Sequence, residues 1–225
     1  MPESSTTKTC HRPKTGPARG RPRSFDRDIA LDQAMRLFWR QGYAATSIAE
    51  LTAAMGINPP SLYGAFGDKE RLFLEAVERY QRSADAAAEQ ILAEAPTARA
   101  AIENLLRSVA EQFTCPDQPS GCMVVTAVMN CPDAEGHLKE VMARIRAASA
   151  GRILNRIRDA IATGELPADT DADALGAFFD TVLQGMTIQA RDGASRASLC
   201  AIAACAMRAW PDRRAASAKP TEDRP

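Results

Sequence analysis

The sequence contains few of the residues from which catalytic centres are usually built. Its 225 residues include only two histidines, His11 and His137, and no dinucleotide-binding, phosphate-loop or zinc-protease motif. The six cysteines form no C-x-x-C pair, and the basic N-terminus lacks the apolar stretch of a secretory signal. We therefore expect a cytoplasmic protein with reduced thiols, without metal, cofactor or enzymatic activity.

Long apolar runs are also missing, since none approaches the ~18 residues that a membrane-spanning helix requires. Aromatic residues make up only 5% of the chain, so its core must consist mainly of aliphatic side chains. The hydrophobic share of 45% and the charged share of 25% are ordinary for a globular protein. These proportions predict a globular chain that does not enter a membrane.

Charge is balanced overall but not along the chain. The 28 Lys and Arg residues equal the 28 Asp and Glu residues in number, yet residues 1–25 carry six basic side chains against Glu3 alone. A basic arm on a mildly acidic body is typical of a protein whose partner is a polyanion.

Helical patterns fill most of the chain between two polar ends. Residues 1–24 and 211–225 have too little apolar content to offset chain entropy, so both are predicted to be disordered. The one β-branched cluster, at 124–128, is too short and isolated to found a sheet. We predict an all-α protein of about nine helices, over residues 26–41, 46–56, 58–67, 68–94, 98–114, 121–131, 134–164, 171–190 and 195–210.

Two short helices in this series are joined by a glycine turn. Ser47 and Glu50 have capping-box spacing at the start of one, and Asn58 with Pro59 makes a favourable start for the other. Gly56 lies between them, as in a helix-turn-helix whose second helix enters the DNA major groove. The same pattern also occurs as a plain corner in helical domains, so spacing alone leaves both interpretations open.

The residues around this corner carry a more specific signal over about 50 positions. They are Gly20-Arg21-Pro22-Arg23, Ala34, Leu37-Phe38, Gly42-Tyr43, Thr46-Ser47-Ile48, Leu51, Gly56-Ile57, Ser61-Leu62-Tyr63, Phe66-Gly67-Asp68-Lys69-Glu70 and Leu72-Phe73. In this order and spacing they closely resemble the DNA-binding domain of the TetR family of bacterial transcriptional regulators. The other two-thirds of the chain resembles the family only in its helical architecture.

The resemblance implies a division of labour along the chain. Residues 25–70 would form an N-terminal three-helix helix-turn-helix head, and residues 71–210 a helical domain for effector binding and dimerisation. The implied protein is a homodimeric repressor that binds a palindromic operator in double-stranded DNA and is released by a small-molecule effector. It would be a regulator and not an enzyme.

Candidate DNA contacts follow from helical geometry and from the family pattern. Leu62 and Phe66 share one face of the second short helix and should pack inward, which turns Pro60 and Gly64 toward the groove. Side chains able to read base edges are Asn58 and Ser61. The family pattern adds phosphate contacts from Thr46 and Ser47 at the start of the first short helix, and from Tyr63 and Lys69, while the basic arm would contact the minor groove. The full predicted contact set is Arg19, Arg21, Arg23, Thr46, Ser47, Asn58, Pro59, Pro60, Ser61, Tyr63, Gly64 and Lys69.

The body supplies candidates for two further surfaces. The last two helices carry apolar stripes, which the core of a single chain could absorb. The resemblance to the family implies instead a four-helix dimer interface made by Leu175, Phe178, Phe179, Val182, Leu183, Met186, Leu199, Ile202, Ala206 and Trp210. A pocket for a small, apolar or weakly polar effector is predicted among Phe113, Cys122, Met123, Val125, Met129 and Phe179, although residues of these types belong to a plain core more often than to a pocket.

Cysteines in the predicted ligand domain leave a second functional interpretation open. Cys115, Cys122 and Cys131 flank a proline-rich loop and a short helix. Because some regulators of this family sense oxidants or electrophiles through such cysteines, a thiol-based switch is the alternative to a reversible effector.

Overall fold

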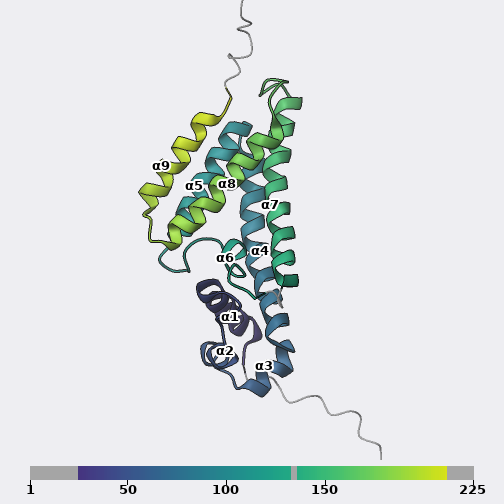
Figure 1. Cartoon of the computed structure of the whole chain (residues 1–225), viewed down its shortest axis with the longest axis vertical. Helices are drawn as coiled ribbons and strands as arrows, with labels where there is room; N and C mark the ends of the chain where they lie inside the picture. The colour runs from purple at the N-terminus through teal and green to yellow at the C-terminus, as the bar shows by residue number, and fades with distance from the viewer. Residues whose placement is uncertain (1–24, 133–135, 212–225) are drawn as a thin grey trace, which may run out of the picture.

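The structure is a computed structural model that describes residues 25–132 and 136–211. Within these ranges it contains nine α-helices and no strand (Figure 1), which confirms the all-α prediction. The predicted arm and all but the first residue of the predicted tail lie outside the described residues. The helices are α1 (Arg27–Gln41), α2 (Ile48–Met55), α3 (Pro59–Phe66), α4 (Lys69–Glu94), α5 (Ala98–Phe113), α6 (Met123–Thr126), α7 (Gly136–Ala162), α8 (Ala172–Arg191) and α9 (Arg196–Ala206).

Polar side chains define where most of these helices begin. Asp26 accepts hydrogen bonds from the first free amides of α1, and Asn58 and Thr97 do the same for α3 and α5. Asp68 and Asp171 cap α4 and α8. Each cap satisfies an amide that has no partner inside its own helix, so the sequence fixes these starts locally.

Two predicted helices are shorter in the structure. The helix expected over 121–131 is reduced to the four residues of α6, Met123–Thr126, and the chain continues in turns over residues 127–130. The Thr126 hydroxyl also donates back to the carbonyl of Cys122 at 3.0 Å. The last predicted helix stops at Ala206 and continues only as a 3₁₀ turn over Met207–Ala209.

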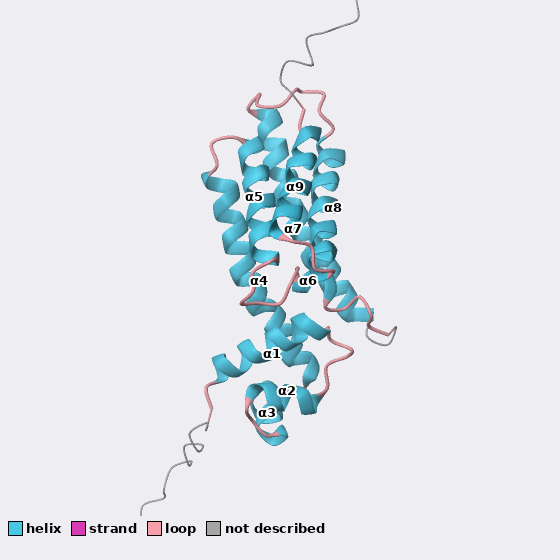
Figure 2. Cartoon of the chain, turned by 90° about the vertical axis from the view of Figure 1, so that its left-hand side faces the viewer, coloured by secondary structure: helices cyan, strands magenta, loops and turns pink. Residues whose placement is uncertain are grey.

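The helices form a small head and a larger body. In Figure 1, α1, α2 and α3 lie at the lower end, and α4 runs from this head into the body beside α7. Helices α5, α8 and α9 complete the body, where α8 contacts α7 and α9 contacts both α5 and α8. Turned by 90°, the molecule shows α6 at the level where the head meets the body (Figure 2), and α6 contacts α1, α4 and α7.

Two apolar cores hold the molecule together. The first is centred on aromatic rings of the head, where the ring centroids of Phe38 and Tyr43 lie 5.1 Å and 4.9 Å from the ring centroid of Phe73. It extends along α4 to Tyr80 and takes in α6 and the start of α7, so apolar packing continues past residue 70. The second core fills the body between α5, α7, α8 and α9. The division into domains at residue 70 stays a prediction.

Candidate DNA-binding site and adjoining cavity

The turn between α2 and α3 has the geometry of a helix-turn-helix. Helix α2 ends at Gly56, whose φ of +65° lies in the left-handed region that favours glycine. Helix α3 starts three residues later, at Pro59, and Leu62 and Phe66 bury its inner face against the head core. The outer face of α3 is therefore held toward solvent by packing alone.

That outer face is small and sterically open. Pro60 and Gly64 are exposed, and Tyr63 is 49% exposed. A Cβ atom added at Gly64 would meet no heavy atom within 4 Å. Asn58 Oδ1 accepts from the amide of Ser61 at 2.9 Å, so the side-chain amide of Asn58 keeps its two N–H donors for another partner. The surface has the shape and donors that a DNA groove can accept.

A cationic group lies at the rim of this face. Lys69 begins α4, and its Nζ atom sits 4.3 Å from the ring centroid of Tyr43. The Tyr43 ring packs against Phe38 and Phe73, so the aromatic core of the head supports the position of the ammonium group. A cation–π contact leaves the N–H donors of Lys69 available, as a phosphate contact requires.

The start of α2 differs from the prediction at one of its two residues. Ser47 is exposed and forms the expected capping box with Glu50, and the hydrogen bonds from Ser47 lower the pKa of that carboxyl. Thr46 is only 1% exposed, and its hydroxyl donates to the carbonyl of Gly42 at 2.6 Å. The structure corrects the predicted phosphate contact of Thr46, since this side chain closes the turn after α1 and faces the interior.

The remaining predicted DNA contacts divide by location. Pro59 is exposed at the first position of α3, while Ser61 is half-buried. Arg19, Arg21 and Arg23 lie outside the described residues.

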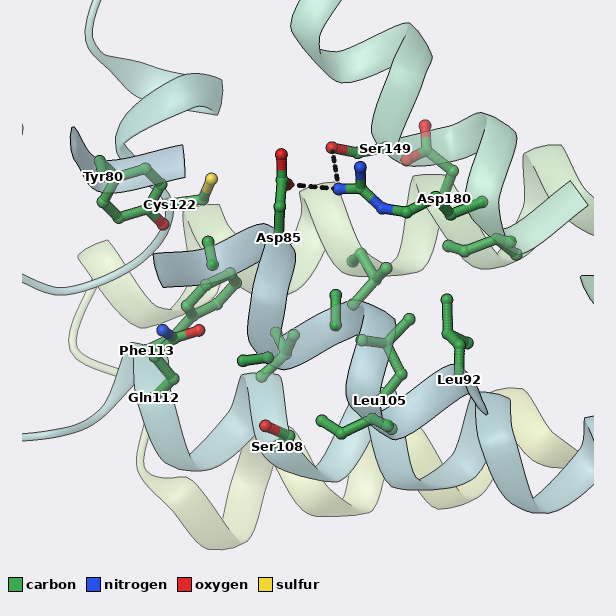
Figure 3. Close-up of a pocket in the computed structure, with 18 residues that line it drawn as sticks. Tyr80, Asp85, Leu92, Leu105, Ser108, Gln112, Phe113, Cys122, Ser149 and Asp180 are labelled. Carbon is green, nitrogen blue, oxygen red and sulfur yellow. Dashed lines mark hydrogen bonds and ion pairs between the residues drawn. The ribbon is translucent and has the colours of Figure 1, made fainter. Parts of the chain in front are cut away.

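A cavity lies in the body, between α4, α5, α6, α7 and α8. It has two adjoining lobes of about 140 Å³ each, which share nine lining residues. One lobe is walled mainly by aliphatic side chains of α4 and α5, and the other reaches α6 and the C-terminal half of α8. Figure 3 shows Leu92 and Leu105 toward one end of the first lobe and Tyr80 with Cys122 toward the other.

One wall of this cavity is charged, although none of the pocket residues predicted from sequence carries a charge. Asp85 pairs with Arg152 at 2.5 Å, and Arg152 also donates to Ser149 at 3.1 Å (Figure 3). Asp180 lines both lobes and accepts a hydrogen bond from Gln184 at 2.6 Å. A sequence signal existed for Asp85, because it is a single acidic residue among the alanines at 84, 86, 87 and 88.

The predicted effector residues are only partly brought together. Phe113, Cys122 and Val125 line the cavity. Met123 is fully buried in the core shared with the head, Phe179 is fully buried against Trp210, and Met129 is 60% exposed. These last three side chains do not line either lobe, and their place in an effector pocket stays a prediction.

The apolar stripes predicted for dimerisation also separate into two sets. Phe179, Met186, Leu199, Ala206 and Trp210 are buried inside the single chain, where they form part of the body core. Phe178 is 39% exposed, and Leu175, Val182, Leu183 and Ile202 are half-buried. Sequence periodicity placed all ten residues on one surface, but α5 and α7 already cover the inner side of α8 and α9.

The described cysteines lie in different surroundings. Cys122 lines both lobes of the cavity, Cys131 is buried in the core shared with the head, and Cys115 borders a separate cleft beside the start of α9. Burial raises the pKa of the Tyr80 phenol well above its usual value, and the neighbouring Cys122 adds to the shift. The three cysteines singled out from sequence therefore do not form one cluster.

A buried helix-turn-helix core with an open outer face, attached to a separate helical body, defines a DNA-binding transcriptional regulator. Comparison with known proteins agrees with this class. Residues 30–76 match the domain family described as bacterial regulatory proteins of the tetR family, and residues 96–204 match the tetracyclin repressor-like C-terminal domain. The chain belongs to the TetR family of transcriptional regulators, whose members are not enzymes.

Several relatives match nearly their whole length. The chain is 36% identical to the HTH-type transcriptional repressor ComR of Escherichia coli K12, over 87% of this chain and 93% of that protein. It is 32% identical to the repressor BdcR of the same strain, over 83% of this chain and 90% of BdcR. It also resembles the solved structure of a cysteine mutant of the TetR family regulator CifR complexed with 26-bp double-strand operator DNA. The two chains are 44% identical and superpose with a TM-score of 0.82, over 85% of this chain and 100% of the CifR chain.

No helix in the described part of the chain is both long and apolar enough to cross a membrane.

Proposed function

We propose that this chain is a cytoplasmic homodimeric repressor that binds a palindromic operator through α3 and releases it when a small molecule enters the body cavity. The observation that carries the proposal is the exposed, sterically open face of α3 on a head whose relative CifR is solved with operator DNA at 44% identity. The names of ComR and BdcR as repressors support repression over activation.

The proposed homodimer would form through the outer faces of α8 and α9. Phe178 and Ile188 are 39% and 38% exposed on α8, and they alternate with small residues, Ala174, Thr181 and Gly185. Helix α9 exposes a matching row of alanines at 197, 201 and 204. Two copies of this face can approach closely and bury both large side chains. A dimer would then bring two heads to two half-sites at high effective concentration.

The arm completes the proposed DNA interface. Arg19, Arg21 and Arg23 precede α1 by only a few residues, and α1 belongs to the head. Arginines in this position can reach a minor groove beside the half-site, where a narrow A·T tract strengthens the negative potential.

The size and charge of the cavity suggest an effector class. Each lobe of about 140 Å³ is close to the volume that holds one benzene-sized ring. The charges of the lining balance, because Asp85 pairs with Arg152 and the remaining two charged residues, Asp180 and Arg146, have opposite signs. We therefore propose a small, mostly apolar effector of up to two rings with at most one polar group, which binds better to a conformation whose heads no longer fit the operator.

A mobility-shift assay on DNA upstream of the gene tests the DNA-binding part. We expect wild-type protein to retard one DNA fragment that contains a palindrome. The double variant Tyr63→Ala with Lys69→Ala should no longer bind that fragment. A matched control, Arg158→Ala, removes an exposed arginine far along the body that pairs with Asp173, and should bind as wild type. Binding of the wild type with the same affinity to every DNA tested would refute an operator-specific repressor.

A thiol switch at Cys122 is the second candidate, and its position in the cavity favours it. An effector with an electrophilic carbon would enter the cavity and meet the Cys122 sulfur, and the nearby Tyr80 hydroxyl can donate a hydrogen bond to a thiolate. Addition to an activated double bond forms one C–S bond, and the thiol proton ends on the neighbouring carbon. Cys131 is too buried, and Cys115 too far outside the cavity, to take this role.

N-ethylmaleimide distinguishes the two candidates. If Cys122 is the sensor, its alkylation should release DNA, and Cys122→Ser should keep DNA bound although the exposed Cys205 still reacts. Cys205→Ser is the matched control, which should respond like the wild type. DNA release that persists in Cys122→Ser would exclude this cysteine as the switch.

A further inference from the structure

Arg191, the last residue of α8, connects the body directly to the head. Its Nη1 atom donates to the carbonyl oxygen of Trp39 at 3.2 Å and to the hydroxyl of Thr126 at 3.0 Å. Its Nη2 atom donates to the carbonyl oxygen of Arg40 at 3.2 Å. One guanidinium group thus joins the ends of α8 and α1 to the end of α6.

The acceptors explain why an arginine suits this position. Trp39 and Arg40 lie in the last turn of α1, where carbonyl groups have no partner within the helix and carry partial negative charge. A planar guanidinium with five donors can satisfy two successive carbonyls and a hydroxyl together, whereas an ammonium group is a single point of charge. Among the described residues no carboxylate forms an ion pair with Arg191, and the three acceptors of its hydrogen bonds are neutral.

A second contact lies at the same joint, the place where the end of α1 meets the end of α8. The indole Nε1 of Trp39 donates to the carbonyl oxygen of Gly121 at 3.1 Å in a buried position. Gly121 has a φ of +75°, and a Cβ atom added there would lie 2.8 Å from the carbonyl oxygen of Thr187. The turn at residue 121 therefore fits tightly between α1 and the last turns of α8.

This joint adjoins the cavity. Leu183, Gln184 and Thr187 line its second lobe, and Arg191 follows Thr187 by one turn of α8. Cys122 and Val125 line the same lobe, on the segment whose Thr126 accepts from Arg191. The head is thus attached to α8 close to the lobe of the cavity where an effector would bind.

We propose that Arg191 is a positioning residue that fixes the head relative to α8 and so sets the distance between the two recognition helices of the dimer. This inference rests on the proposed function, because it requires α8 to lie at the dimer interface and two heads to bind one operator. Rigid heads should fit only one separation of half-sites. Without Arg191 each head can tilt about α4, so that the dimer accepts several separations.

The test measures affinity against half-site spacing. Wild-type protein first selects its palindrome from a random DNA pool, and variants of this operator then carry one base pair more or fewer at the centre. Each change shifts a half-site by about 3.4 Å and rotates it by about 36°. We expect the wild type to lose at least about tenfold in affinity on the altered operators, and Arg191→Ala to lose less than about threefold relative to its own affinity for the selected operator.

Two further variants make the result specific. Arg191→Lys keeps the charge but not the fork of donors, and should fall between the wild type and Arg191→Ala. Arg158→Ala removes the arginine that pairs with Asp173 at the opposite end of α8, and should keep the wild-type spacing preference. All variants should bind a single half-site equally. If Arg191→Ala does not fold, Arg191→Lys decides the matter.

The outcomes separate this inference from the proposed function. Failure of the wild type to select any palindrome would contradict the dimeric repressor itself. A selected palindrome together with an Arg191→Ala variant that keeps the full spacing preference, or that weakens on all operators by one common factor, would overturn the role of Arg191 alone.

Discussion

Two adjacent phenylalanines of α8 should respond to substitution in opposite ways. Phe179 is fully buried, with its ring 5.8 Å from that of Trp210, whereas Phe178 is 39% exposed. Truncation of a fully buried phenylalanine removes transfer free energy and leaves a cavity, and typically costs about 3–5 kcal/mol. Phe179→Ala should therefore lower the free energy of unfolding by that amount.

Phe178 should instead affect association. A buried aromatic side chain covers about 150–250 Å², so its exposed share is on the order of 80 Å² in each protomer. At about 25 cal/mol per Å², covering this area in both copies contributes about 4 kcal/mol to a symmetric dimer, as an upper estimate. Phe178→Asp removes that contribution and places two carboxylates in the interface, so the dimer should weaken at least about 100-fold.

Sedimentation and urea unfolding, each at several protein concentrations, separate the two effects, because dimerisation itself adds to apparent stability. We expect Phe178→Asp to sediment as a folded monomer at micromolar concentration, and Phe179→Ala to unfold at lower urea. A Phe178→Asp protein that remains dimeric, or a Phe179→Ala protein as stable as the wild type, would refute the division of α8 into an inner and an outer face.

Three other predictions concern the head, the joint and the arm. Lys69→Ala should weaken binding to operator and random DNA by similar factors and reduce the salt slope by about one unit, and an unchanged slope would contradict a phosphate contact. Trp39→Phe should cost about 1–3 kcal/mol of stability in urea unfolding, because the buried carbonyl of Gly121 loses its donor; equal stability would mean that water replaces the indole. Deletion of residues 1–24 should leave the melting temperature unchanged but lower DNA affinity, most on operators with A·T-rich flanks, and equal affinity on A·T and G·C flanks would identify the arm as a passive tail.

Local signals along the chain predict most of the head correctly. Ser47 with Glu50, Asn58 with Pro59, and the glycine at 56 each act over three or four residues, so the starts and ends of α2 and α3 follow from sequence alone. Burial of Thr46 was missed because its partner, the carbonyl of Gly42, becomes available only when the chain turns after α1.

The body is less predictable for a physical reason. Helical periodicity shows that a face of α8 is apolar, but not whether a neighbouring helix or another chain covers it. Phe178 and Phe179 could not be separated until the places of α5, α7 and α9 were known. The cavity lining has the same origin, since Asp85 and Arg152 meet from helices that are distant in sequence.

The open surroundings of Gly64 bear on how this regulator can change its target. A side chain added at this position projects away from the head core and meets no heavy atom within 4 Å, and replacing a helical glycine by alanine stabilises a helix by roughly 0.5–1 kcal/mol. With α3 in the major groove as proposed, a single substitution at Gly64 would add a base contact without loss of fold stability. A duplicated copy of the gene could diverge toward a different operator one substitution at a time, while its folding core and its cavity stay as they are.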